Sequence, residues 1–362
     1  MLAPSLKALL LLPVALRLAL AQASNATTAC NNGVELCQRA YNNITHLGAH
    51  DSPFVRDASN GFDISGNQYY NSTVQLNAGV RLLSAQVQTN STSNQLSVCH
   101  TSCSLLDAGT LSSWLREVNT WLLANENEVV TVLLVNGAGA SATDLAAEYE
   151  ATGVSDIAYR PASSTASQTW PTLQDLISNG TRLLSFVSTL SDNSAAPYLM
   201  NEFTYVFENS YENYTPSDFS CTAARPPTVA NQTATALASG LMPLMNHFLY
   251  EQQGFGIETP NDTYAATTNA PTAGGGVGNL GDAATRCASE YGRNPTFLLV
   301  DFFNVGPAIS TVDRLNGVTD PVGRTAISTA VASASTSGAA SAVALRGSML
   351  CLSLLAIAYG LA

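Results

Sequence analysis

The chain has 362 residues and a formal net charge of −12, with 14 basic and 26 acidic side chains. We expect cleavage of an N-terminal signal peptide and of a C-terminal tail, which would remove Lys7, Arg17 and Arg346. The remaining 11 arginines against 26 acids give a net charge of −15. This composition excludes a basic patch for nucleic acid and long-range attraction to an anionic membrane. An anionic substrate would have to be held by local contacts.

The first 23 residues are typical of a signal peptide, because Lys7 precedes an apolar run and Ala21-Gln-Ala23 suits cleavage before Ser24. The body, residues 24–325, has the length of one α/β barrel domain. Apolar and β-branched runs predict strands at 44–49, 80–87, 96–99, 129–135, 183–187 and 297–303, with weaker candidates at 157–159, 203–207 and 241–248.

Helices are predicted at 72–78, after a cap at Thr110, at 144–151 and from Leu173. The alternation of strands and helices predicts a parallel sheet of about eight strands. Residues 260–281 are expected to form a surface loop, since their glycine run lacks the Gly-Lys-Ser/Thr ending of a phosphate loop.

The C-terminal region has the pattern of a GPI-attachment signal. A Ser/Thr/Ala-rich linker at 326–346 precedes Gly347–Ala362, an uncharged and mostly apolar tail of 16 residues. That tail is shorter than the ~20 residues that span a membrane. We expect the ω site within Ser335–Gly338, which predicts an extracellular protein held at the cell surface. A tail-anchored or a fully secreted protein is the alternative.

Six of the seven cysteines remain once the tail that contains Cys351 is removed, and an even number in a secreted chain indicates disulfides. Six cysteines allow fifteen pairings. Proximity favours Cys30–Cys37 and Cys99–Cys103, leaving Cys221–Cys287; zinc at Cys99 and Cys103 is the competing interpretation. Eight Asn-X-Ser/Thr sequons also fit a secreted glycoprotein: Asn25, Asn43, Asn71, Asn90, Asn179, Asn213, Asn231 and Asn261.

Two of the four histidines stand at the ends of short predicted strands. His50-Asp51-Ser52 follows the strand at 44–49, and His100 follows the strand at 96–99. In a parallel barrel the C-terminal strand ends carry the chemistry, and two imidazoles suit a reaction in which one takes a proton and the other gives one. The alternative is a structural pair.

Carboxylates are expected to orient these imidazoles. Strand alternation would turn Asp51 toward His100, and Asp301, late in the last predicted strand, could hold His50 or serve as an ion-pair or capping group. Of the other histidines, His46 would lie deeper in the barrel core, whereas His247 could line the pocket or belong to the core.

Together, Gly48-Ala-His-Asp-Ser52, Gly79-Val-Arg-Leu-Leu83 and Val98-Cys-His100 resemble the phosphatidylinositol-specific phospholipase C X domain. The likeness to secreted fungal PLC-like phosphodiesterases is closer, and it is supported by 105–109, 246–249 and 297–304. The resemblance implies a distorted TIM-type barrel in one domain. It also implies that His50 acts as general base on the inositol 2-hydroxyl, and that His100 acts as general acid on the leaving alkoxide, giving a cyclic phosphodiester.

The chain departs from that family in the second strand. The bacterial branch has a phosphate-binding arginine there and the eukaryotic branch has calcium-binding acids, but these positions fall on Ser84 and Gln86. Gln86 can donate to a phosphate oxygen without supplying a cation. Arg56 is the candidate substitute, whereas Arg81 is expected to face the other side of the strand. Gln86, Arg56 and His247 are therefore the predicted substrate-binding residues.

The leading hypothesis is a GPI-anchored, secreted, monomeric phosphodiesterase without a metal or cofactor, acting on a phosphoinositide lipid or a glycosyl-inositol phosphodiester. Two alternatives remain. One is a catalytically weak surface glycoprotein that keeps the barrel for binding. The other is a metal-dependent glycerophosphodiesterase, which would need acids where Ser84 and Gln86 stand.

Overall fold

The computed structural model describes residues 28–271 and 277–332. The predicted signal peptide, the candidate ω site, the apolar tail, Asn25 and part of the glycine run lie outside these ranges. Within the described ranges, no helix combines the length and apolar character that crossing a membrane requires.

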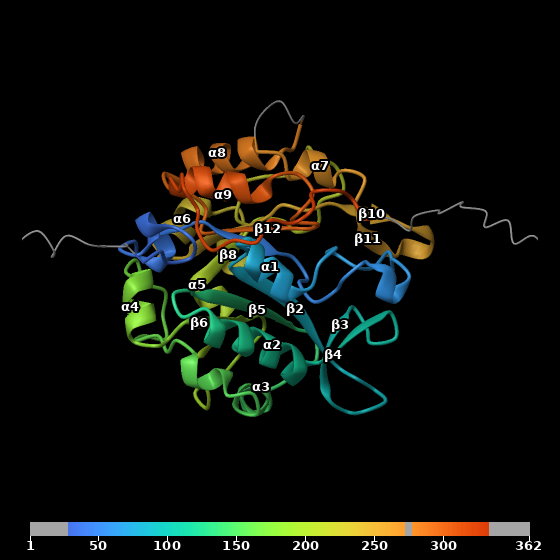
Figure 1. Cartoon of the computed structure of the whole chain (residues 1–362), viewed down its shortest axis with the longest axis horizontal. Coiled ribbons are helices and arrows are strands. Elements are labelled where there is room, and N and C mark those ends of the chain that lie inside the picture. Colours follow the sequence, from blue (N-terminus) through green and yellow to red (C-terminus); the bar gives the residue numbers. More distant parts are fainter. Residues whose placement is uncertain (1–27, 272–276, 333–362) are drawn as a thin grey trace, which may run out of the picture.

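A curled parallel sheet of eight strands forms the centre of the molecule (Figure 1), in the order β7-β6-β5-β2-β1-β12-β9-β8. The strands are β1 (His46–Ala49), β2 (Leu82–Thr89), β5 (Val130–Asn136), β6 (Leu183–Val187), β7 (Leu199–Asn201), β8 (Val206–Glu208), β9 (Met242–Asn246) and β12 (Phe297–Val300). Among the described residues, the edge strands β7 and β8 do not pair, and the single turn α5 (Glu202–Tyr205) connects them. The sheet is thus a barrel left open at one seam, which confirms the distorted TIM-type fold.

Two pairs of short strands lie at the C-terminal end of the sheet, which we call the mouth (right in Figure 1). β3 (Leu96–His100) pairs antiparallel with β2, and β4 (Leu106–Thr110) with β3. β10 (Tyr250–Gln252) and β11 (Glu258–Pro260) form a separate hairpin. The opposite end, the base, is covered by the segment before β1 and by α4.

Helices pack outside the sheet (Figure 1). They are α1 (Ser72–Ala78), α2 (Leu111–Ala124), α3 (Ala142–Glu150), α4 (Leu173–Ser178), α6 (Thr233–Ala238), α7 (Ala265–Thr268), α8 (Leu280–Tyr291) and α9 (Ala308–Asn316). The helix predicted at 72–78 is α1, and the Thr110 hydroxyl caps α2 by accepting from the Ser113 amide. The strand predicted at 203–207 is wrong in its first half, which is helical, and the loop predicted at 260–281 contains α7.

Period-two alternation divides the buried residues of the strands into two layers. One set fills the barrel interior, as Leu133 of β5 does. The alternate set, such as Val132 and Leu134, packs with the outer helices. Because both faces of β5 are covered, its sequence is a continuous apolar run, as expected for a parallel strand.

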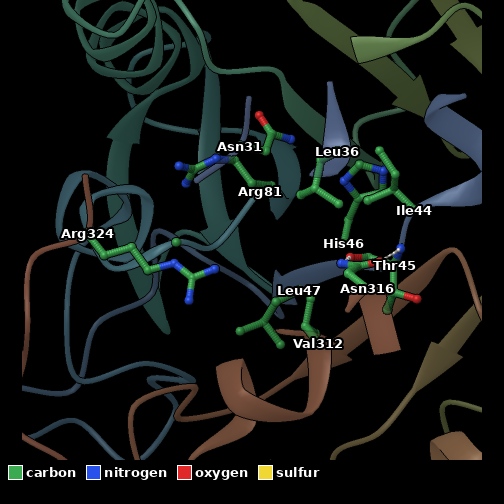
Figure 2. A pocket seen from close by; sticks show the side chains of 11 residues that line it. Asn31, Leu36, Ile44, Thr45, His46, Leu47, Arg81, Val312, Asn316 and Arg324 are labelled. Atoms are coloured by element: carbon green, nitrogen blue, oxygen red, sulfur yellow. Dashed lines mark hydrogen bonds between the residues drawn. The ribbon is translucent and has the colours of Figure 1, made fainter. Parts of the chain in front are cut away.

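The base of the barrel is filled by aromatic side chains. Tyr41 lies against His46 and Trp170, with ring centroids 4.7 and 5.4 Å apart. His46 is buried with Nε2 3.2 Å from the Tyr41 carbonyl oxygen, and burial lowers its pKa to about 4. A cavity of about 20 Å³ beside it, bounded by Arg81 and Arg324 (Figure 2), has room for about one water molecule. His46 is thus a neutral core residue.

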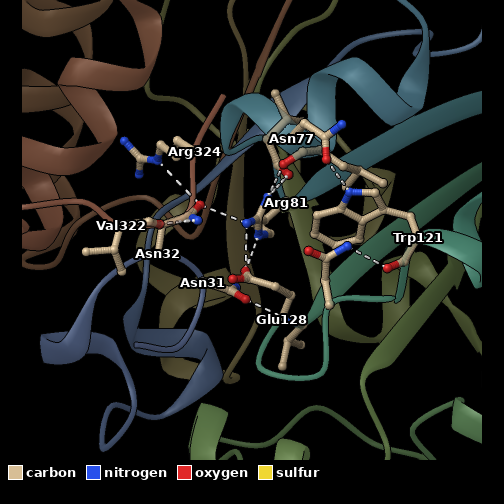
Figure 3. Close-up of polar contacts among 12 residues, drawn as sticks. Asn31, Asn32, Asn77, Arg81, Trp121, Glu128, Val322 and Arg324 are labelled. Carbon is tan, nitrogen blue, oxygen red and sulfur yellow. Dashed lines mark hydrogen bonds and ion pairs between the residues drawn. The ribbon is translucent and has the colours of Figure 1, made fainter. Parts of the chain in front are cut away.

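Arg81 ties the two ends of the described chain to the base (Figure 3). Its guanidinium, 4% exposed, pairs with Glu128 at 2.6 Å and donates to the Asn32 side chain and to the carbonyls of Leu76 and Val80, each at 2.7 Å. The Asn32 side chain in turn donates to the Val322 carbonyl. Arg81 therefore faces outward, away from the barrel interior, as strand alternation predicts.

The structure contains the disulfides Cys30–Cys37, Cys99–Cys103 and Cys221–Cys287, which are the pairs that proximity favours. The Cys99–Cys103 bond engages both thiols that the zinc interpretation would use. Among the described sequons, Asn213 is 1% exposed and its amide donates to the carbonyls of Ser210 and Asn246. The folded chain therefore presents no glycan acceptor at Asn213.

Arg81→Met should lower the free energy of unfolding by about 3 kcal/mol, because it leaves Glu128 without its buried partner and two carbonyls without a donor. Equilibrium urea unfolding with the disulfides intact measures the change. Arg116→Met, at an exposed site on α2, is the control and should stay within about 0.5 kcal/mol of the parent. Equal stability of the two variants would contradict this account of the base.

Candidate active site

Parallel pairing of β1 with β12 brings His50 and Asp301 together at the mouth. Ala49 lies opposite Val300, so the residues that follow the two strands are neighbours. The Nδ1 atom of His50 is 2.9 Å from Oδ1 of Asp301. With its proton on Nδ1, the imidazole donates to the carboxylate and keeps Nε2 free for a second partner.

Two amides from the loop after β1 hold this pair in place. Asn67 donates to Oδ1 of Asp301 at 3.1 Å, and Gln68 donates to the carbonyls of His50 and Val300 at 2.8 and 3.0 Å. Gln68 thus bridges the ends of β1 and β12. Sequence reasoning missed both residues, because a single amide in a polar loop has no periodic pattern that could indicate its partner.

Asp51 lies between the two imidazoles. Its Oδ2 atom is 3.7 Å from Nε2 of His50 and 3.5 Å from Nε2 of His100. The same oxygen accepts a hydrogen bond of 2.7 Å from Gln86, and the Asp51 amide donates to the Ser84 hydroxyl at 2.8 Å. The structure therefore brings His50, His100 and both predicted carboxylates into one cluster.

Backbone conformation turns the chain sharply at each of the three strand ends. Asp51, Thr101 and Phe302 have φ values of +48°, +59° and +45°, in the left-handed region. Asp51 directly follows His50, Thr101 follows His100, and Phe302 follows Asp301. A β-branched or bulky residue rarely adopts this conformation, and such positions concentrate at functional sites.

Rings pack against both imidazoles. His50 stacks on Phe248 with centroids 3.8 Å apart and planes 3° from parallel, and the ring of Phe54 meets His100 edge to face at 5.3 Å. The His50 side chain is 12% exposed and that of His100 is 7% exposed. Both imidazoles are thus largely shielded from solvent.

Burial and charge move the two imidazole pKa values in opposite directions. Burial alone would lower the pKa of His50, but the negative charges of Asp51 and Asp301 outweigh it, so that pKa is raised above its usual value. For His100, burial prevails over the attraction of Asp51, and its pKa is lowered. In the free protein the cluster therefore binds a proton on His50 first.

A cavity of about 240 Å³ opens beside His50 and Gln86. Its wall across the barrel carries Glu202, Glu208 and Arg225. Arg225 pairs with Glu208 and lies over the Tyr211 ring at 4.3 Å. Burial raises the pKa of Glu202 well above its usual value, whereas the hydrogen bond with Glu202 and the charge of Arg225 lower the pKa of Glu208 despite its burial. Of the described arginines, Arg225 is the one that lines this cavity.

Two of the predicted substrate-binding residues lie elsewhere. Arg56 pairs with Asp262 at 3.2 Å and does not line the cavity. His247 is 1% exposed, stacks on Phe219 and has Nε2 3.1 Å from the Thr268 carbonyl oxygen. His247 is therefore a core residue and does not line the cavity. Asn246 lines the cavity instead, and alternation along β9 turns its neighbour His247 outward.

An open TIM-type barrel with a histidine–carboxylate cluster at its mouth defines the class of this protein. The family model PI-PLC X 1 matches residues 36–316, and the chain belongs to the PI-PLC X family. A PI-PLC X domain-containing protein 1 of Arthroderma benhamiae is 38% identical over 309 residues, covering 84% of this chain and 96% of that protein. An uncharacterized secreted protein of the same fungus is 36% identical, over 81% of this chain and 65% of its own length.

Solved structures with the same fold include the phosphatidylinositol-specific phospholipase C of Listeria monocytogenes. That chain has a TM-score of 0.51 and 17% identity, with 78% of this chain and 94% of that chain covered. A Staphylococcus aureus enzyme of the same name has a TM-score of 0.53 and 14% identity, with 80% and 98% covered. Family and fold together support a phosphodiesterase-like function.

Asp301→Asn should lower the pKa of His50, because it removes a negative charge 2.9 Å from the ring. If neutral His50 is the active form, the acidic limb of the kcat–pH profile then moves to lower pH. We also expect kcat to fall by about 10²–10⁴-fold, since the proton is no longer fixed on Nδ1. Asp262→Asn removes a mouth carboxylate that does not contact His50 and should leave the limb in place. If the acidic limb of the kcat–pH profile stays in place in Asp301→Asn, the pairing of His50 with Asp301 is contradicted.

Proposed function

We propose that the chain is a secreted phosphodiesterase that cleaves an inositol-type phosphodiester, in a lipid or a glycosyl-inositol, by acid–base catalysis with His50 and His100. The observation that carries the proposal is that both Nε2 atoms converge on one oxygen of Asp51 and that His50 lines a cavity of head-group size. Two imidazoles so placed can act on the two oxygens that exchange at one phosphorus.

His50 would act as the base. Its Nδ1 proton is engaged by Asp301, so Nε2 can take the proton of a neighbouring hydroxyl of the head group. That oxygen forms a bond to phosphorus while the bond from phosphorus to the leaving oxygen breaks. His100 would give its Nε2 proton to the leaving oxygen, releasing an alcohol and a cyclic phosphodiester.

The pKa order in the free protein is the reverse of what these roles need, since the raised value belongs to His50. An anionic phosphate bound beside His100 favours the protonated form of that ring. Substrate binding therefore supports transfer of the proton to His100 and leaves His50 neutral. Activity is expected to depend on one protonated imidazole in the pair.

Arg225 supports the binding of a polar head group at the far wall of the cavity. Its guanidinium is paired with Glu208 and 38% exposed, so it can still donate to a ligand. The carboxyl of Glu202, whose pKa is raised by burial, and the amide of Asn246 lie on the same wall. These groups suit the hydroxyls of a polyol.

A lipid substrate is supported by the residues around the mouth. Exposed apolar or aromatic side chains occur in the loops that follow the strand ends, at Ile64, Leu105, Tyr211, Tyr214, Ile257 and Tyr264. Side chains of this kind can contact a lipid surface without the basic charge that this chain lacks. Secretion is supported by the signal-peptide pattern, by the disulfides and by similarity to a secreted fungal protein, and the C-terminal pattern supports attachment through GPI.

A catalytically weak surface glycoprotein remains the alternative, because Gln86 supplies no cation and Arg225 is already paired. The metal-dependent alternative has less support. In the described ranges, the group of potential metal ligands is Cys99, Cys103 and Asp107, and the two cysteines form a disulfide. Activity that survives EDTA would set the metal-dependent alternative aside.

His50→Asn and His100→Asn should each lower kcat by about 10³-fold on phosphatidylinositol vesicles, with release of cyclic inositol phosphate followed by phosphorus NMR. His50→Asn is informative because its amide can still donate to Asp301, so the loss reports the missing proton acceptor. Melting temperatures of both variants check the fold. Turnover equal to the parent in either variant would contradict the proposed roles.

A further inference from the structure

We propose that Gln86 is a positioning residue, which fixes the Asp51 carboxylate between the two imidazoles and ties it to the turn after His100, and does not bind the substrate. This inference rests on the proposed function for its catalytic consequence. Its structural part concerns the contacts of the Gln86 side chain with Asp51 and Thr101 and can be tested without substrate.

Both ends of the Gln86 amide are engaged. The Nε2 group donates to Oδ2 of Asp51 at 2.7 Å, and the Oε1 atom accepts from the amide of Thr101 at 2.8 Å. Thr101 is the left-handed residue directly after His100, so one side chain connects the residue after β1 with the turn after β3. Turning the Gln86 side chain toward a ligand would break both hydrogen bonds, including the charge-assisted one to the Asp51 carboxylate.

Ser84, two residues earlier on the same face of β2, holds Asp51 from the other side. Its hydroxyl accepts from the Asp51 backbone amide at 2.8 Å, while Gln86 holds the carboxylate. Asp51 has a positive φ, a conformation that persists only where the surroundings enforce it. Ser84 and Gln86 together thus hold Asp51 in this conformation.

The neutrality of Gln86 has an electrostatic consequence. A cation at this position would cancel the charge of Asp51, whereas an amide leaves most of that charge to the imidazoles. The second oxygen of Asp51 is buried without a partner in the described part of the chain, so no other group shares the charge. Gln86 therefore sets both where Asp51 lies and how strongly it favours the protonated imidazole.

Gln86→Met removes both hydrogen bonds at nearly constant volume, and Gln86→Asn keeps an amide that is too short to reach both partners. We expect kcat to fall about ten- to hundredfold in both, with KM within about twofold of the parent. The matched control is Gln88→Met, at a half-buried glutamine on the same face of β2 that packs over Gly137. It should behave as the parent.

The second readout is the titration of the His50 and His100 imidazoles by NMR. The charged and titratable groups that face the pair are Asp51, Asp301, Asp63, Glu208 and Tyr250. Without Gln86 the Asp51 carboxylate is no longer held between the rings, so its attraction for their protonated forms weakens and we expect the pKa of at least one imidazole to fall by about half a unit. A rise would mean that Asp51 keeps its place without Gln86, which would contradict the positioning role.

A rise in KM with kcat and both imidazole pKa values unchanged would overturn the proposal, because that pattern marks a direct substrate contact. Parent-like behaviour of Gln86→Met in both readouts would overturn it as well. If the parent and Gln88→Met cleave no phosphodiester, the proposed function fails, and the NMR titration still decides the role of Gln86.

Discussion

The structure depends on how one buried carboxylate, that of Asp51, is satisfied. An ionised group in this position is costly unless charge and hydrogen bonds compensate for it. Compensation comes from Gln86 and from the two imidazoles that face the same oxygen. Because these partners belong to different segments, the mouth can take this form only when β1, β2 and β3 are correctly paired.

The residues that stabilise the fold and those of the candidate active site lie at opposite ends of the barrel. At the base, aromatic rings and the fully paired Arg81 fill the space below β1, and His46 is held neutral. At the mouth, the strand ends carry left-handed residues and carboxyl oxygens without partners in the described ranges, those of Asp51 and Asp301. Packing at one end thus stabilises an arrangement at the other that is costly by itself.

Sequence patterns predicted the features that follow from strand periodicity. The end of β1 located His50, and the same reasoning turned Asp51 toward His100, offered Asp301 as a partner of His50 and placed Arg81 on the outer face; it did not predict that Asp51 lies between both rings. Strand periodicity does not predict the contacts of loop residues. Asn67, Gln68 and Arg225 acquire their roles from contacts with strands distant in the sequence, and no local spacing indicates such contacts. For β9, the pattern could not tell whether Asn246 or His247 faces the cavity, because a short apolar strand buried on both faces has no polar alternation.

The four histidines of this chain allow a direct test of the central claim, that His50 and His100 face one anion-binding site while the other two imidazoles belong to the core. The measurement is a titration of nitrogen-15 histidine-labelled protein with inositol 1-phosphate, followed by NMR. The account predicts that the ring resonances of His50 and His100 shift with a common dissociation constant, and that those of His46 and His247 stay unchanged. A shift of only one of the pair, or an equal shift of His247, would contradict it.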